Sequence, residues 1–209
     1  MVLGILLPGC TKSFAPGIEK GKLEDNSGLK SKTEQANVKK NEKLTPGDFF
    51  PISTGHSWEY QGEGNEYASF TRNVIGVKNS LSQIREDNGG TVSASVFRST
   101  KEAITHIFFI GEAYDQTNYL DSKPNQNIVI LKAPLKIGTK WYNTNEVREI
   151  VDINVNISTP AGIFQKCVKV KISAKNSIVN EYFKEGIGMV KREFISGDAI
   201  ITSSLAKYK

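Results

Sequence analysis

The chain has 209 residues, of which 38% are hydrophobic and 9% aromatic, and its formal net charge at pH 7 is +5. That apolar content is enough to build a core, so a wholly disordered chain is excluded. Eight lysines and five acidic residues lie within residues 11–47 and supply +3 of the charge, which leaves +2 for residues 48–209. A nearly neutral domain is poorly suited to nucleic acid, whose binding depends on neutralising many phosphates.

The first ten residues are apolar and end in Leu7-Pro8-Gly9-Cys10. This ending resembles the last part of a bacterial lipoprotein signal peptide, in which a peptidase cuts before the cysteine and the thiol receives a lipid. A thiolate is the nucleophile that this lipid transfer requires. The resemblance implies a signal peptide over residues 1–9 and a lipid on Cys10, which would anchor the chain at the outer face of the cell membrane.

Two features depart from that signal pattern. Pro8 stands where a smaller or β-branched residue is usual. The stretch before the cysteine has only nine residues, and none of them is basic. A secretory signal has a charged start and a longer apolar stretch, so we expect the true start to lie upstream of Met1. The alternative is an apolar N-terminus with an incidental cysteine.

The segment that follows, residues 10–47, is predicted to be a disordered tether between the lipid and a domain. It is rich in Lys, Glu, Asn, Ser, Gly and Thr, and Phe14 is its only aromatic residue. Such a segment buries too little apolar surface to offset its ordering entropy. A flexible chain of this length spans roughly 30–35 Å, which would hold the domain clear of the lipid headgroups.

From residue 48 onward, short stretches of alternating apolar and polar residues predict strands. These stretches cover residues 67–77, 81–86, 91–97, 104–110, 127–131, 147–157, 164–172, 179–183, 189–194 and 200–205. Glycines 186 and 188 indicate a hairpin, and no amphipathic helix is expected. The prediction is one mainly β domain over residues 48–209, an antiparallel meander that forms a half-open barrel or a sandwich.

A weak internal repeat relates two parts of this domain. Residues 51–58 and 134–141 both contain Pro, an aliphatic residue, Gly and Trp at matching offsets, and the two tryptophans, Trp58 and Trp141, are 83 positions apart. In each copy the tryptophan would begin a strand and anchor it to the core. The repeat predicts two similar β units or two equivalent corners of one sheet.

Three motifs of the domain carry a family resemblance. They are Phe49-Phe50-Pro51-Ile52-x-x-Gly55-x-x-Trp58, Thr159-Pro-Ala-Gly-x-Phe164-x-x-Cys167 and Glu181-Tyr-Phe-x-x-Gly186-x-Gly188. They resemble a family of secreted bacterial lipoproteins, many from Gram-positive anaerobes, without an established activity. The resemblance covers residues 49–195 and implies export and lipid anchoring. The all-β order also resembles periplasmic half-barrels that handle lipid or lipoprotein.

Residues that carry chemistry are few. His56 and His106 are the only histidines, and neither has a metal-binding spacing, so no metal or cofactor is expected. Cys167 is the one candidate nucleophile in the domain, and without a nearby base it is expected to be a quiet structural thiol. Strict alternation would place Cys167 on the face opposite Phe164 and Lys166.

Acidic and aromatic residues gather at the start of the domain. Glu59, Glu63 and Glu66 follow Trp58, and such groupings can hydrolyse or bind sugars. Core anchoring explains the tryptophans more simply. The candidate ligand contacts are Trp58, Tyr60, Trp141 and Tyr142.

These observations favour a lipid-anchored, extracytoplasmic binding or interaction module that is not an enzyme. Its partners would be the membrane, through Cys10, and an envelope protein, a carbohydrate or a lipid. One alternative is a carrier of lipid or another hydrophobic ligand in a half-barrel cavity. A second is an extracytoplasmic hydrolase that uses the acids near Trp58.

Overall fold

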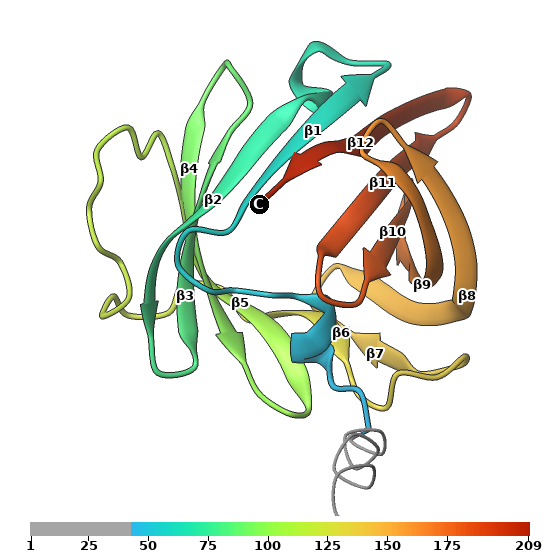
Figure 1. Ribbon diagram of the computed structural model, residues 1–209, viewed down its shortest axis with the longest axis horizontal. Coiled ribbons are helices and arrows are strands. Elements are labelled where there is room, and N and C mark those ends of the chain that lie inside the picture. The colour runs from blue at the N-terminus through green and yellow to red at the C-terminus, as the bar shows by residue number, and fades with distance from the viewer. Residues whose placement is uncertain (1–42) are drawn as a thin grey trace, which may run out of the picture. The chain divides into compact units, whose positions relative to one another are not determined.

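The computed structural model describes residues 43–209. They form one compact unit, Lys43–Lys209, built from twelve strands and two short 3-10 helices (Figure 1). The expected signal peptide, Cys10 and most of the expected tether lie outside the described residues. Within residues 43–209, no helix is long and apolar enough to cross a membrane.

The strands match the alternating stretches of the sequence to within a few residues, because period-two patterns report which face of a strand is buried. The helices are η1 (Pro46–Phe49) and η2 (Glu66–Ala68). The strands are β1 (Ser57–Glu63), β2 (Phe70–Lys78), β3 (Leu81–Asp87), β4 (Val92–Ser99), β5 (Ala103–Gly111), β6 (Ile128–Lys132), β7 (Lys140–Tyr142), β8 (Glu146–Thr159), β9 (Gly162–Ala174), β10 (Ile178–Lys184), β11 (Gly188–Ser196) and β12 (Ala199–Tyr208).

All twelve strands belong to one antiparallel sheet in the order β6-β5-β4-β3-β2-β1-β12-β11-β10-β9-β8-β7. Two six-stranded meanders, β1–β6 and β7–β12, therefore meet where β1 pairs with β12. The sheet curls round so that β6 and β7, its two edges, approach one another in a nearly closed barrel (Figure 1). The predicted fold class is confirmed.

The internal repeat forms two equivalent corners of this sheet. Gly55 and Gly138 have φ values of 90° and 84°, a region that favours glycine. The Gly55 N–H donates to the carbonyl of Val74 in β2, and the Gly138 N–H donates to the carbonyl of Ile150 in β8. The N–H groups of Val74 and Ile150 donate in turn to the carbonyl of the residue that follows the glycine in each corner. The two copies thus start their meanders with the same hydrogen bonds.

The two tryptophans also take equivalent places. Trp58 Nε1 donates to the carbonyl of Ile187 at 2.7 Å, and Trp141 Nε1 donates to the carbonyl of Val129 at 2.9 Å. Both rings are buried in the core. The prediction of two equivalent corners is confirmed.

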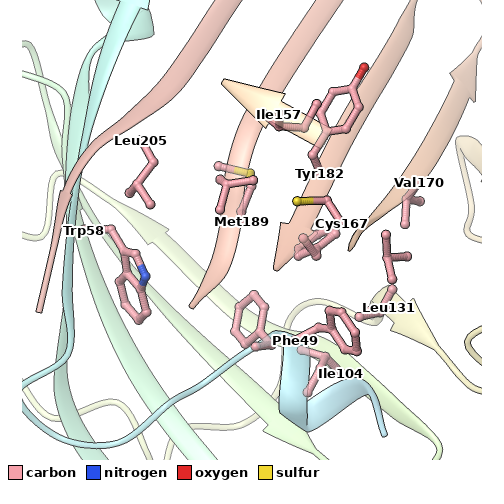
Figure 2. Close-up of a cluster of buried hydrophobic side chains, with 14 of the residues drawn as sticks. Phe49, Trp58, Ile104, Leu131, Ile157, Cys167, Val170, Tyr182, Met189 and Leu205 are labelled. Carbon is pink, nitrogen blue, oxygen red and sulfur yellow. The ribbon is translucent and has the colours of Figure 1, made fainter. Parts of the chain in front are cut away.

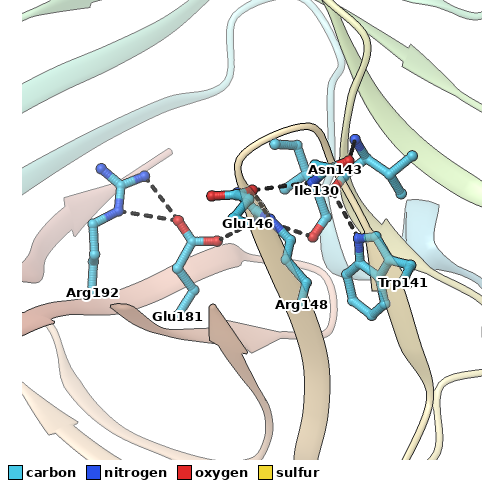
Figure 3. A network of polar contacts seen from close by, with 8 residues as sticks. Ile130, Trp141, Asn143, Glu146, Arg148, Glu181 and Arg192 are labelled. Atoms are coloured by element: carbon cyan, nitrogen blue, oxygen red, sulfur yellow. Dashed lines mark hydrogen bonds and ion pairs between the residues drawn. The ribbon is translucent and has the colours of Figure 1, made fainter. Parts of the chain in front are cut away.

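Side chains bridge the gap between β6 and β7, where no backbone ladder joins the strands in the described part of the chain. Asn143, just after β7, accepts from the Val129 N–H at 3.0 Å and donates to the Val129 carbonyl at 3.1 Å. Trp141 shares that carbonyl, and Arg148 Nη1 donates to the carbonyl of Ile130 at 3.2 Å (Figure 3). We call this β6–β7 contact, made by Trp141, Asn143 and Arg148, the seam.

Apolar side chains fill much of the space inside the sheet (Figure 2). Ile104 and Leu131, from the first meander, and Leu205, from the second, have no exposed surface. Phe49 of η1 joins this core, and η1 contacts β5 and β11, one strand from each meander. The N-terminal 3-10 helix therefore helps to hold the two halves together.

A second, smaller core lies on the outer face of the first meander. Val96 and Ile107 pack there against Leu120 from the loop between β5 and β6. The buried amide of Gln83 fixes this loop, because it donates to the carbonyl of Thr117 and accepts from the N–H of Tyr119, both at 2.8 Å. The loop thus covers what would otherwise be an exposed apolar face.

The expected placement of Cys167 is wrong. Lys166 has a φ of 56°, and the β8–β9 register shifts on both sides of the Val155–Cys167 pair. A bulge adds a residue to one strand and breaks the period-two alternation. As a result Phe164 and Cys167 are both buried, whereas Lys166 is exposed.

Candidate functional site

The four aromatic residues proposed as ligand contacts do not form one site. Trp58 and Tyr60 lie in β1, and their polar atoms are paired with backbone carbonyls; the Tyr60 hydroxyl donates to Met189 at 2.8 Å. Trp141 is a buried part of the seam, whereas its neighbour Tyr142 is 75% exposed. Ligand contact by these side chains stays a prediction.

The acidic residues near Trp58 lie on the surface. Alternation along β1 puts Glu59 on the face opposite Trp58, and Glu63 and Glu66 are also exposed. Glu59 pairs with Lys207 of β12 at 3.0 Å. Among residues 43–209, no cluster of three or more His, Cys, Asp or Glu side chains could hold a metal ion.

Cys167 is fully buried, and its thiol donates to the carbonyl of Phe164 at 3.5 Å. Burial raises the pKa of the thiol to about 11, which keeps it protonated at neutral pH. Because the thiolate is the reactive form, the structure supports the quiet structural role expected from the sequence.

Cys167 should therefore resist a thiol reagent until the domain unfolds. In a Cys10→Ser chain, where it is the only thiol, we expect no reaction with dithionitrobenzoate in buffer and reaction of one equivalent in concentrated denaturant. The absorbance of the released thionitrobenzoate measures the reaction of the folded and of the unfolded chain. Complete labelling of the folded chain within minutes would contradict the buried position.

Charged and polar side chains line a cavity of about 220 Å³ inside the sheet, beside the apolar core. They come from both meanders, on β2, β3, β4, β5, β8, β10 and β11. The polar lining residues are Arg72, Glu86, Ser93, Ser95, His106, Arg148, Glu181 and Arg192. Phe50, Phe97 and Phe109 are among the apolar ones.

Sequence reasoning missed this cavity, although a signal for it was present. Along β2, Arg72 is in phase with the buried Phe70, and along β8, Arg148 is in phase with the buried Ile150. Glu181 is in phase with the buried Phe183 in the same way. A charged residue in the buried phase of an alternating strand indicates a polar interior.

Glu181 links two of the arginines (Figure 3). Its Oε2 accepts from Arg148 Nη1 at 3.3 Å, and its Oε1 lies 3.1 Å from Arg192 Nε and 3.0 Å from Arg192 Nη2. Arg148 Nε in turn donates to Glu146 at 2.6 Å. The Arg148 and Glu181 side chains are only 8% and 7% exposed, whereas Arg192 is 32% exposed. The network thus runs from the buried interior toward solvent.

The third arginine has its own partner. Arg72 of β2 and Glu86 of β3 are direct cross-strand neighbours, and Arg72 Nε donates to Glu86 Oε2 at 2.6 Å. The Arg72 guanidinium also lies 5.0 Å from the centroid of the Phe70 ring, close enough for a cation–π contact.

The arginines keep both lining carboxylates charged. Burial by itself raises the pKa of Glu181, but Arg192, Arg148 and Arg72 outweigh it and hold the pKa below its usual value. Burial likewise opposes ionisation of Glu86, and Arg72 and Arg192 lower its pKa. The cavity lining therefore carries three positive and two negative side chains, a net charge of +1.

His106 lies in the wall of the cavity, stacked on Phe97 with ring centroids 4.8 Å apart. Burial lowers its pKa, and the charge of Arg72 adds to this effect. Its Nε2 atom is buried and has no hydrogen-bond partner within residues 43–209. The folded domain thus holds this imidazole in its neutral form at neutral pH.

The lowered pKa of His106 should make stability depend on pH in the weakly acid range. Below the ordinary histidine value of about 6.5, the unfolded chain binds a proton that the folded chain does not yet bind. Stability should therefore fall as the pH drops from 6.5 toward the folded pKa. A His106→Gln chain should lose this slope, measured as urea unfolding free energy against pH. An unchanged slope would contradict the burial of the imidazole.

Comparison with protein-family models gives no match, and comparison with curated proteins gives none. Two solved structures are similar to this chain. A candidate exported protein with a YmcC-like fold from Bacteroides fragilis has a TM-score of 0.48 and 14% sequence identity, over 77% of this chain and 98% of that chain. A candidate lipoprotein from Parabacteroides distasonis has a TM-score of 0.39 and 17% identity over the same shares.

Proposed function

We propose that the protein is a lipid-anchored, extracytoplasmic binding module and that its interior cavity holds a small polar ligand. The observation that carries this proposal is the surplus of N–H donors around the cavity. Arg72 uses only its Nε, and neither of its Nη atoms has a hydrogen-bond partner in the described chain. N–H donors that face a cavity without a protein partner are free to bind a ligand, so the lining is complementary to a ligand that supplies acceptors.

The cavity has the size of a small-molecule site, with a volume of about 220 Å³. Small-molecule sites combine apolar walls with a few fixed polar groups, and this lining does the same, with phenylalanines beside the arginines.

The charges argue against the hydrophobic-carrier alternative. Placing an apolar ligand against five charged side chains would remove water from them without replacing its hydrogen bonds, which is costly. The apolar part of the interior is already occupied by packed side chains of the core (Figure 2).

We also propose binding without catalysis. A general acid or base works best when its pKa lies near the working pH. The arginines instead hold the pKa values of Glu86 and Glu181 below normal. The surface acids of the hydrolase alternative, Glu59, Glu63 and Glu66, are not among the residues that line the cavity.

The anchoring half of the proposal rests on the sequence that ends in Cys10. In a bacterial host, the full gene product should fractionate with membranes, and its Cys10→Ala version should be released from them. Immunoblots of the two fractions measure this. A Cys10→Ala chain that stays with the membrane would show that the lipid is not the anchor.

Native mass spectrometry tests the binding half. The Cys10→Ala chain, purified without denaturation, should carry a small adduct that is lost on denaturation. Ser95→Leu adds bulk inside the cavity and should abolish the adduct, whereas Arg98→Leu, on the exposed side of the same strand, should retain it. An adduct retained equally in both variants would place the binding site outside the cavity.

A further inference from the structure

The three arginines of the cavity converge on one space. The guanidinium carbons of Arg72 and Arg192 lie 5.0 Å and 5.9 Å from the centroid of the same Phe70 ring, although the two residues belong to different meanders. Glu181 connects Arg192 to Arg148. Three guanidinium groups therefore face the same cavity instead of being spread over the domain.

Positive charge predominates on the wall of the cavity. Three arginines and two carboxylates, Glu86 and Glu181, line it. The third carboxylate of the network, Glu146, pairs with Arg148 at 2.6 Å but is not among the lining residues. An occupant of the cavity therefore meets more guanidinium groups than carboxylates, which favours an anionic ligand over a neutral or a cationic one.

Hydrogen bonding points in the same direction. Four guanidinium nitrogens have no hydrogen-bond partner in the described residues. They are both Nη atoms of Arg72, Nη1 of Arg192 and Nη2 of Arg148. Among the charged and imidazole side chains of the lining, the unpaired acceptors are fewer, namely Glu86 Oε1 and His106 Nε2. The hydroxyls of Ser93 and Ser95 can both donate and accept. An oxyanion offers several lone pairs, and a guanidinium binds such a group through two parallel N–H bonds.

Aromatic side chains form another part of the cavity wall. The Phe97 ring contacts the ring of Phe50, at a centroid distance of 5.0 Å, and that of His106, at 4.8 Å. All three rings line the cavity. They offer an apolar surface against which a flat or compact hydrocarbon part of a ligand can pack.

We propose that the cavity binds a small organic anion, with its carboxylate or phosphate held by Arg72 and Arg192 and its apolar part packed against Phe97. This inference rests on the proposed binding function and names the chemical class of the ligand. The arginine carboxylate partners then serve to fix the guanidinium groups in place before the ligand arrives.

Three probes of similar shape test the charge requirement. Benzoate, phenyl phosphate and the neutral benzamide would each be titrated into the full chain by isothermal calorimetry at constant ionic strength. We expect benzoate or phenyl phosphate to bind at least about tenfold more tightly than benzamide, since hydrogen bonds to charged groups are the strong ones. The tighter of the two anions shows whether the site prefers a carboxylate or a phosphate.

Variants locate the anion. Arg72→Met should weaken the better anion at least about tenfold, and Arg192→Met, which removes a half-exposed side chain, should do the same if Arg72→Met fails to fold. Arg98→Met, which removes a positive charge from the exposed side of β4, is the matched control and should leave the affinity unchanged.

Failure of this inference can be told apart from failure of the proposed function. If benzamide binds as tightly as the anions and Ser95→Leu blocks it, the cavity is a binding site but not an anion site. If Arg98→Met weakens the anions as much as Arg72→Met does, the binding is a general charge effect and the inference is wrong. If neither anion binds, the inference is also wrong, and a co-purified adduct lost in Ser95→Leu would still support the proposed function.

Discussion

Replacing Glu181 with alanine is expected to lower the free energy of unfolding by about 3–5 kcal/mol. The carboxylate is the shared partner of Arg148 and Arg192. Its removal takes from Arg192 its carboxylate partner in the described chain and leaves Arg148 with Glu146 alone, and breaking a buried ion pair on one side is strongly destabilising. Urea unfolding of the full chain, followed by tryptophan fluorescence, measures the loss.

Glu59→Ala is the matched control for this prediction. It also removes a carboxylate from an ion pair, but its pair with Lys207 is at the surface, and surface pairs contribute little to stability. Its unfolding free energy should be close to that of the unchanged chain. Equal losses of unfolding free energy in both variants would mean that the interior network contributes no more to stability than a surface pair.

A double variant separates stability from binding. Replacing a buried charge network with apolar side chains of similar volume is often neutral or stabilising. Glu181→Leu combined with Arg192→Met removes both charges of one pair and leaves Arg148 paired with Glu146. This double variant should therefore recover much of the stability lost in Glu181→Ala. The same double variant should still bind the organic anion less tightly, because its cavity has lost a guanidinium group and its fixing carboxylate.

Trp141→Ala should produce the second large effect, a loss of about 3–5 kcal/mol, the usual cost of truncating a buried aromatic side chain. It should also open the seam, because Trp141 Nε1 donates to Val129 of β6. Hydrogen exchange with mass spectrometry should show faster exchange in β6 (Ile128–Lys132).

Trp58→Ala provides the comparison, since Trp58 occupies the equivalent corner but its β1 strand is held by backbone ladders on both sides. It should cost a similar amount of stability without selectively speeding exchange in β6. If both variants change β6 exchange equally, the seam is not the weak edge of the sheet.

Alternation was sufficient to predict the strands and the fold class, because each strand has one buried and one exposed face. The repeated Pro–Gly–Trp pattern was sufficient to predict two equivalent corners. The prediction from alternation failed at Lys166, where a positive φ marks a bulge that no residue type in the sequence indicates. Local patterns also gave no sign that β1 pairs with β12, since that pairing joins segments more than a hundred residues apart.

The candidate site could not be assembled from local patterns for a related reason. Arg72, Arg148, Glu181 and Arg192 belong to four strands in two meanders, and only the curvature of the sheet brings them to one cavity. Aromatic residues at the starts of two strands were instead predicted from the sequence to contact a ligand. Three of those, Trp58, Tyr60 and Trp141, proved to be core residues whose polar atoms bond to the backbone.

The seam makes the two junctions between the meanders unequal. Six residue pairs join β1 to β12, whereas side chains of Trp141, Asn143 and Arg148 close the other side. Breathing of the barrel should therefore be concentrated at the β6–β7 side, with the β1–β12 ladder as the hinge. Arg148 takes part in both the seam and the cavity, so an occupant of the cavity that draws this guanidinium inward would change how tightly the barrel is closed.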